Sequence, residues 1–587
     1  MRSVLIFLAF IHTALALEIR EIRWGFDGKA MPNRFNLLSV LVAQEGGARP
    51  FDGELALIET RGGELGVGAP IAQPLYLTPG TQRWVQFVPF VSQENEWRLR
   101  WGQGEKARFV VPAAKFGPPA TVLLRDATAV FADTARLAAF PDELFPTSVA
   151  ATDALDQIVL DHTPRWDAPR REAFLDWLRR GGIVHLLRGP EGHPRFEGDL
   201  AVLNETGRIG AGRVIRHDVG REDCDEAFLA KAGYARREFK KQEGNTGPML
   251  YRFDQTLLQN LASLTKPQVQ WWLLYLLTLA YLAFIGPVHY AWSRKVDWRL
   301  AIAGFLGTVA VFALAFIIAG HRGSGEKQTS HSLAIARSLG GDRWDVQEWV
   351  SAFATKGDFY KLTHTAPANY YSALSDAEGV NGKITGGKDG HFDVDIPLYS
   401  ARPFLHRAVM SGPKAEVKVI EWKADKLVLE LPETFPRVTG SAHLRLRGQI
   451  RSVAVDGRKI AYADSKGGLV APEDHWFSDN ELRALQQFEW TNRMFDPKSA
   501  STPLFARSLG GVKAMPHALT PRPLSPDHLQ IFLFAEAPAS FAMKGKGFDR
   551  GRGHVLYVID VFRPDSSASA SSSSSASPAR KQETERK

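Results

Sequence analysis

Two long apolar stretches interrupt a chain whose other hydrophobic residues are spaced as in strands and short helices. Residues 269–288 contain no charge, and after a short basic stretch a second uncharged run extends from Leu300 to Gly320. About 20 apolar residues suffice for a helix to cross ~30 Å of hydrocarbon. Aromatic residues flank the first run, as they do at membrane interfaces. The pattern predicts a transmembrane hairpin with helices over 269–292 and 300–320 and a loop over 293–299.

Before and after this hairpin, short alternating segments separated by turn residues predict β-structure. Residues 17–116 are typical of an immunoglobulin-like β-sandwich, and residues 325–470 of a second sandwich-like domain with a hairpin turning at Asp456-Gly457. Residues 471–565 predict an α+β region, in which a helix over 478–494 precedes two paired strands. The serine-rich tail, 566–587, cannot bury a core and is expected to be disordered.

Residues 117–262 have a different pattern, in which strands alternate with a helix. The stretch "DAPRREAFLDWLRRGG" predicts a helix capped by Asp167 and ended by Gly181 in a left-handed conformation. We expect its apolar stripe, which includes Phe174, to pack on a sheet, and Arg179 and Arg180 to face outward. Apolar strands on either side predict an open, mainly parallel α/β sheet.

The first residues predict export. Arg2 precedes a short apolar segment, and Ala14-Leu15-Ala16 is similar to a signal-peptide cleavage site, so residues 1–16 are expected to be a signal peptide. Export of residues 17–268 places the 293–299 loop in the cytoplasm, in agreement with its three basic residues, and everything after residue 320 outside. We therefore expect a protein of the bacterial inner (cytoplasmic) membrane, with most of the chain on the periplasmic side.

Composition narrows the functional classes. The 587 residues are too many for one core, and the net charge of +8 is spread along the chain without a basic stripe, which argues against nucleic-acid binding. The single cysteine, Cys224, excludes an intrachain disulfide framework and cysteine-based zinc sites. The fold class is thus multidomain α/β and all-β.

One resemblance connects these segments. The stretches "WLRRGGIVHLL" and "FIGPVHYAWSRKVDWRLA" resemble bacterial membrane proteins that join a β-sandwich, a flavodoxin-like, class I glutamine amidotransferase-like domain and a helical hairpin. The resemblance covers roughly residues 18–470 and implies association with other envelope proteins. Active members of that family need a cysteine on a strand-to-helix elbow. Cys224 lies instead in "GREDCDEAF", where acidic neighbours oppose thiolate formation.

Other candidate residues are few. Asp161 and His162 follow a predicted strand and are the only plausible beginning of a hydrolytic site, whereas His185 and His193 lack the spacing of a helical metal site. We therefore predict no catalytic, cofactor-binding or metal site. The leading hypothesis is a non-catalytic scaffold or binding component of an envelope complex, with the lipid bilayer and other envelope proteins as partners.

Two alternatives remain open. The first is an envelope hydrolase of amidotransferase-like fold with a site near Asp161. The second is a carbohydrate- or peptide-binding module that uses Trp97 and Trp101 on a sandwich face, although core positions for these two tryptophans are the preferred interpretation.

Overall fold

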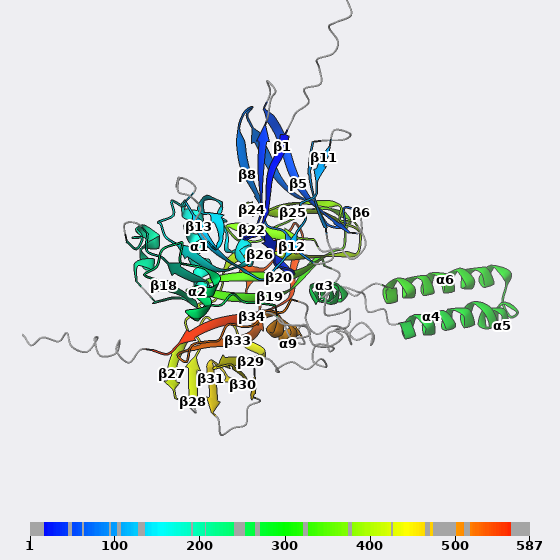
Figure 1. Ribbon diagram of the computed structural model, residues 1–587. Helices are drawn as coiled ribbons and strands as arrows, with labels where there is room; N and C mark the ends of the chain where they lie inside the picture. The colour runs from blue at the N-terminus through cyan, green and yellow to red at the C-terminus, as the bar shows by residue number, and fades with distance from the viewer. Residues whose placement is uncertain are drawn as a thin grey trace, which may run out of the picture.

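The computed structural model describes residues 17–564 except for 45–49, 62–63, 93–95, 103–106, 127–135, 190–191, 206, 240–252, 265–270, 321–326, 374–378, 424–425, 464–469, 473–499 and 510–516. The expected signal peptide (1–16), the expected helix over 478–494 and the expected disordered tail (566–587) lie outside the described residues. The protein is mixed α/β and rich in sheets, and a pair of helices projects from its body (Figure 1).

The N-terminal part contains two antiparallel sheets around one core. The first consists of β1 (Leu17–Trp24), β4 (Leu38–Gln44) and β8 (Gln82–Phe87). The second contains β11 (Arg108–Val110), β10 (Glu96–Trp101), β5 (Phe51–Arg61) and β7 (Ile71–Leu77). Trp97 and Trp101 alternate with polar residues along β10 and are 3% and 7% exposed, in the same core as Leu38 and Leu55. The preferred interpretation of the two tryptophans as core residues is therefore correct.

This second sheet does not end with the N-terminal part. Beyond β7 it continues into three strands from the other side of the hairpin: β23 (Gly382–Thr385), β25 (His391–Ile396) and β21 (Asp358–Leu362). The junction pairs Ile384 with Ile71, and Phe392 joins the N-terminal core. The expected separation of residues 17–116 from residues 325–470 thus does not correspond to separate sheets.

The α/β segment has a six-stranded sheet in the order β14-β13-β15-β16-β18-β17. Its strands are β14 (Ala138–Pro141), β13 (Ala120–Arg125), β15 (Leu155–Leu160), β16 (Ile183–Leu186), β18 (Gly212–Arg216) and β17 (Gly207–Ile209). Neighbours pair in parallel except β17 with β18. The predicted, mainly parallel sheet is confirmed. Its central strands β15 and β16 are buried along their whole length, although β15 contains Asp156 and Gln157 and β16 contains His185.

Helix α1 (Ala168–Arg179) follows the local predictions except at its last turn. The Asp167 carboxylate accepts a hydrogen bond from the Arg170 N–H, and Gly181 has a φ of +116°. Phe174 is buried, as expected for the packed stripe. The expectation that Arg180 faces outward was wrong. Its side chain is only 12% exposed and is held between two carboxylates, whereas that of Arg179 is 34% exposed.

The two apolar runs form the projecting helices. The first comprises α4 (Trp271–Ala283), a π-helical turn (Phe284–Val288) and α5 (His289–Ser293), and the second is α6 (Trp298–Gly320). Pro287 lies inside the π-helical turn, as expected where a missing N–H loosens a helix. Both helices are long and apolar enough to cross a membrane, and their side chains are not buried by the rest of the protein.

The largest sheet is formed after the hairpin. Its order is β24-β22-β26-β20-β19-β34-β33-β29-β30-β31-β28-β27. The outer strands are β24 (Gly387–Lys388), β22 (Ala368–Ser372), β30 (Gln449–Asp456), β31 (Lys459–Ala463), β28 (Lys426–Glu430) and β27 (Lys418–Trp422). Central in it are β26 (Ser400–Ser411), β20 (Arg343–Ala354), β19 (Thr329–Gly340), β34 (Asp549–Phe562), β33 (His528–Glu536) and β29 (Val438–Leu446). The predicted pairing of the two late strands, β33 and β34, and the predicted turn at Asp456-Gly457 are both confirmed. However, β34 also pairs in parallel with β19, so the segment expected as a separate region, 471–565, supplies the middle of this sheet.

The packing constrains any membrane arrangement. Strands that precede the hairpin in sequence share a sheet with strands that follow it. Ion pairs also join residues before the hairpin to residues after it: Arg180 to Asp345, and Asp254 to Arg507. A chain that forms these contacts must have both segments in the same compartment. If α4 and α6 cross a bilayer, they therefore do so as a hairpin that returns to the side from which it started.

Candidate functional site: an arginine-lined cavity

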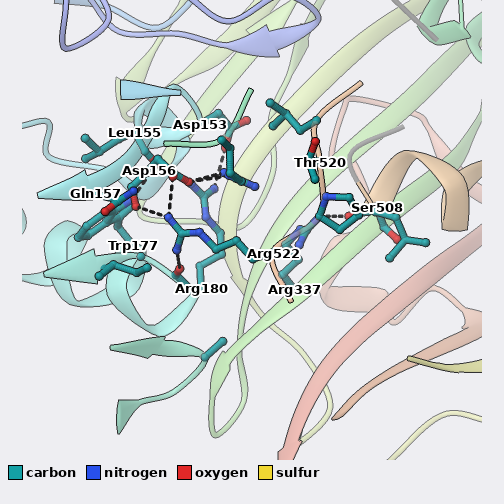
Figure 2. Close-up of a pocket in the computed structure, with 18 of the residues that line it drawn as sticks. Asp153, Leu155, Asp156, Gln157, Trp177, Arg180, Arg337, Ser508, Thr520 and Arg522 are labelled. Carbon is teal, nitrogen blue, oxygen red and sulfur yellow. Dashed lines mark hydrogen bonds and ion pairs between the residues drawn. The ribbon is translucent and has the colours of Figure 1, made fainter. Parts of the chain in front are cut away.

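A cavity of about 710 Å³ lies where the N-terminal strands, the α/β sheet and the large sheet meet. Met31 and Arg34 come from the N-terminal part, Asp156 and Gly181 from the α/β segment, and Arg337 from β19. Figure 2 shows Asp153, Asp156 and Arg180 gathered in one group, with Arg337 and Ser508 apart from them. The cavity is thus assembled by the packing of segments that are far apart in the chain.

Its lining is strongly cationic. Among the described residues, ten arginines and four carboxylates line it, which is a formal excess of six positive charges. The arginines are Arg34, Arg180, Arg213, Arg236, Arg237, Arg337, Arg407, Arg445, Arg507 and Arg522, and the carboxylates are Asp153, Asp156, Asp345 and Glu238. Guanidinium groups present several N–H donors in a fixed plane, which suits them to bind carboxylates and phosphates.

One part of this charge is neutralised internally. Arg180 Nη1 lies 2.7 Å from Asp153 Oδ1 and 3.0 Å from Asp345 Oδ2. Arg407 Nη2 contacts the same two oxygens at 3.2 and 2.6 Å. Burial alone would raise the pKa of Asp153, but Arg407 and Arg180 hold it below its ordinary value. This quartet of Arg180, Arg407, Asp153 and Asp345 joins the α/β segment to the large sheet.

A second carboxylate, Asp156, is shared by two arginines. Arg237 lies 2.7 Å from its Oδ1 and Arg522 lies 2.6 Å from its Oδ2. Burial favours the neutral acid, yet the two guanidiniums lower the pKa of Asp156. Arg522 also donates to the carbonyl oxygen of Gly181 at 3.1 Å, at the C-terminal end of α1, where carbonyl groups are not bonded within the helix. One of the two positive charges is therefore not balanced by Asp156.

Arg34 and Arg337 have no carboxylate at salt-bridge distance among the residues that the structure describes. Arg34 donates to the Asn33 carbonyl at 3.1 Å, and Arg507 donates to the same oxygen. Arg337 donates to the Ser508 carbonyl at 2.5 Å. Burial, reinforced by Arg507, lowers the pKa of Arg34 well below its ordinary value, and burial together with Arg180 lowers the pKa of Arg337 to about 10. A bound anion would relieve both effects.

Asp161 and His162, the residues predicted as the beginning of a hydrolytic site, occupy the expected place at the carboxyl end of β15. His162 lies between two carboxylates, with Nδ1 3.0 Å from Asp161 and Nε2 3.3 Å from Asp142. Burial alone would lower the pKa of His162, but these bonds raise it to about 9. Arg221 contacts Asp161 at 2.6 Å. A histidine that is protonated at neutral pH cannot accept a proton as a general base.

The other two candidate histidines, His185 and His193, both lie near His217, but their direct partners differ from those of His162. His185 is buried between His217 and Gln157, at 2.9 Å from each, and burial lowers its pKa to about 3. His193 contacts Asp218 at 3.1 Å. The structure thus does not bring His162, His185 and His193 to one site.

Cys224 is only 1% exposed and packs beside Leu123 and Leu229. Burial, and secondarily Asp225, raises the pKa of its thiol to about 11. The expected effect of acidic neighbours is present, but burial is the larger cause. A thiol with this pKa supplies almost no thiolate at neutral pH.

Comparison with known proteins adds no family. No protein-family model matches the chain, and no curated protein matches it. One similar solved structure is a cycloisomaltooligosaccharide glucanotransferase from Paenibacillus sp. complexed with cycloisomaltoheptaose, at 7% identity and a TM-score of 0.16, covering 78% of this chain and 98% of that one. Another is a β-glucuronidase of glycoside hydrolase family 2, at 9% identity and a TM-score of 0.14, covering 94% of this chain and 62% of that one. Likenesses with such low TM-scores do not define the fold or the function.

Proposed function

We propose that the protein is a non-catalytic, membrane-anchored component of a bacterial envelope complex whose arginine-lined cavity binds an anionic group. The observation that carries this proposal is the excess of ten arginines over four carboxylates around one cavity. Like charges gathered in a buried place are costly unless a counter-charge is present. The ligand chemistry that fits is a multivalent phosphate or carboxylate, either on a small molecule or on a polymer of the envelope.

The membrane part of the proposal rests on the apolar helices and on the packing between the two sides of the hairpin. We propose that α4 and α6 anchor the protein in the inner membrane and that the body lies in the periplasm, as the export-like N-terminus suggests. The amidotransferase-like ancestry of the α/β segment belongs to the same proposal. It is supported by the parallel sheet and by the helix that ends at Gly181.

Binding fits the cavity better than hydrolysis does. Asp153, Asp156 and Asp345 each form ion pairs with arginines. These carboxylates are therefore engaged in salt bridges and are poorly placed to act as general bases. His528 also lines the cavity, and its Nε2 lies 2.7 Å from Asp560. The Asp161–His162 pair, on which a hydrolase would depend, does not belong to the residues that line this cavity.

The test uses the full-length protein purified in a mild detergent. Titration calorimetry with pyrophosphate and, separately, with citrate would distinguish phosphate from carboxylate recognition, and sodium chloride at equal ionic strength controls for screening. Arg337→Gln should weaken binding at least tenfold, because a hydrogen bond to a charged group contributes roughly 1.5–3 kcal/mol.

The matched control is Arg136→Gln, since this side chain is 65% exposed and outside the cavity. It should bind the anion as the unmodified protein does. Failure of the protein to bind either anion, or equal affinity in the Arg337→Gln variant, would contradict an anion site in this cavity.

A further inference from the structure

A second polar cluster lies inside the protein, away from the arginine-lined cavity. Glu348 on β20 stands directly opposite His406 on β26, and His364 approaches them from the turn after β21. All three side chains are buried. A carboxylate and two imidazoles enclosed in a sheet interior need partners that compensate for the loss of water.

The spacing of the donor atoms matches a coordination site. Glu348 Oε2 lies 3.1 Å from His406 Nδ1 and 3.3 Å from His364 Nε2, and the three ligand atoms lie within 4.8 Å of one another. Two ligand atoms bound to Zn²⁺ at ~2.1 Å in tetrahedral geometry are about 3.4 Å apart. The cluster is therefore already close to the size that an ion requires.

The hydrogen bond between His406 Nε2 and Asn369 leaves the lone pair of His406 Nδ1 directed toward Glu348. The amide nitrogen of Asn369 donates to the carbonyl oxygens of His364 and Ala366, which orients the Asn369 oxygen as an acceptor. This oxygen is 3.0 Å from His406 Nε2, so His406 carries its proton there when neutral. Nδ1 then faces the Glu348 carboxylate, and two acceptors at 3.1 Å need a cation or a proton between them.

His364 has a comparable arrangement. Its Nδ1 lies 3.1 Å from the Tyr371 hydroxyl, whereas its Nε2, although near Glu348, makes no hydrogen bond to any residue that the structure describes. Glu348 Oε1 is likewise buried, without a hydrogen-bond partner in the described part of the chain. Each histidine thus has an outer partner on one ring nitrogen and turns the other toward the carboxylate, which is the usual arrangement of histidines that bind metals.

We propose that Glu348, His364 and His406 bind a divalent transition-metal ion, with Zn²⁺ the best match to two imidazoles and one carboxylate. The two rings are stacked, with 3.6 Å between their centroids and 7° between their planes, so coordination requires them to open slightly toward the ion. Because the site is enclosed, the ion would be incorporated during folding and would hold β20, β26 and the 364 turn together. This proposal does not depend on the anion-binding function.

The first experiment measures the metal content of the full-length protein, purified with a tag that lacks histidine and without chelator. Mass spectrometry of the metals should give about one zinc per chain, and His406→Gln should lose it. His185→Gln is the matched control, since His185 is also a buried histidine but its ring nitrogens contact His217 and Gln157, and it should keep the metal.

The second experiment remains informative if His406→Gln does not fold. Protein produced in cobalt-supplemented medium should show the visible absorption of tetrahedral Co²⁺, and His364→Cys should add a thiolate-to-cobalt charge-transfer band. An unmodified protein that contains no transition metal after refolding with excess Zn²⁺ would overturn the proposal. So would zinc that persists in both His406→Gln and Glu348→Gln, because the ion would then be bound elsewhere.

Discussion

Replacing Arg180 by Gln should destabilise the protein far more than the same replacement at Arg179. Arg180 contacts Asp153 at 2.7 Å, Asp345 at 3.0 Å and the Thr152 hydroxyl at 3.0 Å. Removing one member of a buried ion pair costs about 3–5 kcal/mol, because a charge remains buried without its partner. Arg407 would still contact both carboxylates, so we expect a loss near the lower end, about 3 kcal/mol.

Arg179 is the control because it is the adjacent residue with the same chemistry. Its side chain is 34% exposed and lies 3.0 Å from the buried carboxylate of Asp176, which Arg343 also contacts at 2.7 Å, so its replacement should cost only about 1 kcal/mol. Urea-induced unfolding of the full-length protein in detergent, followed by tryptophan fluorescence, gives the free energies of unfolding. The double variant Arg180→Gln/Asp153→Asn should recover part of the lost stability, because it leaves Arg407 paired with a single carboxylate, Asp345.

Equal unfolding midpoints for the Arg180→Gln and Arg179→Gln variants would refute this reasoning. They would mean that Arg180 contributes no more to stability than the half-exposed Arg179 does. A double variant that is less stable than Arg180→Gln alone would show instead that the Asp153 carboxylate is stabilising without Arg180.

Further predictions concern other parts of the chain. Gly181→Val should cost more than about 1 kcal/mol in the same titration, because a φ of +116° suits glycine alone, and a neutral result would contradict the positive φ. The raised pKa of His162 should stabilise the protein fully below pH 6.5, with this contribution lost as pH rises through about 9; thermal melts of His162→Gln should lack this dependence. Cys224 should react only slowly with iodoacetamide at neutral pH, and Cys224→Ala should retain any cellular phenotype. A reporter fused at Lys295 should be active only if it is a cytoplasmic reporter, and periplasmic activity there would overturn the proposed topology.

Features encoded by neighbouring residues were predictable. Helix α1 is defined by three local signals: the cap at Asp167, the apolar stripe that includes Phe174, and the stop at Gly181. The two apolar helices are defined in the same local way by their uncharged runs. The hairpin at Asp456-Gly457 is likewise set by its own turn residues. In each of these cases the physical cause lies within a short stretch of sequence.

Features that depend on distant partners were not predictable. Arg180 was expected at the surface because its helix ends there, but its partner Asp345 lies 165 residues later in the chain. The cavity combines Arg34 with Arg522, and no spacing pattern connects them. Glu348 and His406 meet only because β20 and β26 are adjacent strands, so the cluster matches no metal-binding motif and none was predicted.

The position of β34 has a consequence for how the protein is made. Its residues, 549–562, are synthesised after every other described strand of this sheet, yet they fill the gap between β19 and β33. Until they arrive, both neighbours expose an unpaired strand edge, which other chains can bind. A nascent or truncated chain is therefore vulnerable to aggregation and to proteases until β34 has been synthesised. A nonsense mutation shortly before residue 549 should remove the protein from the cell as effectively as one near the start of the gene.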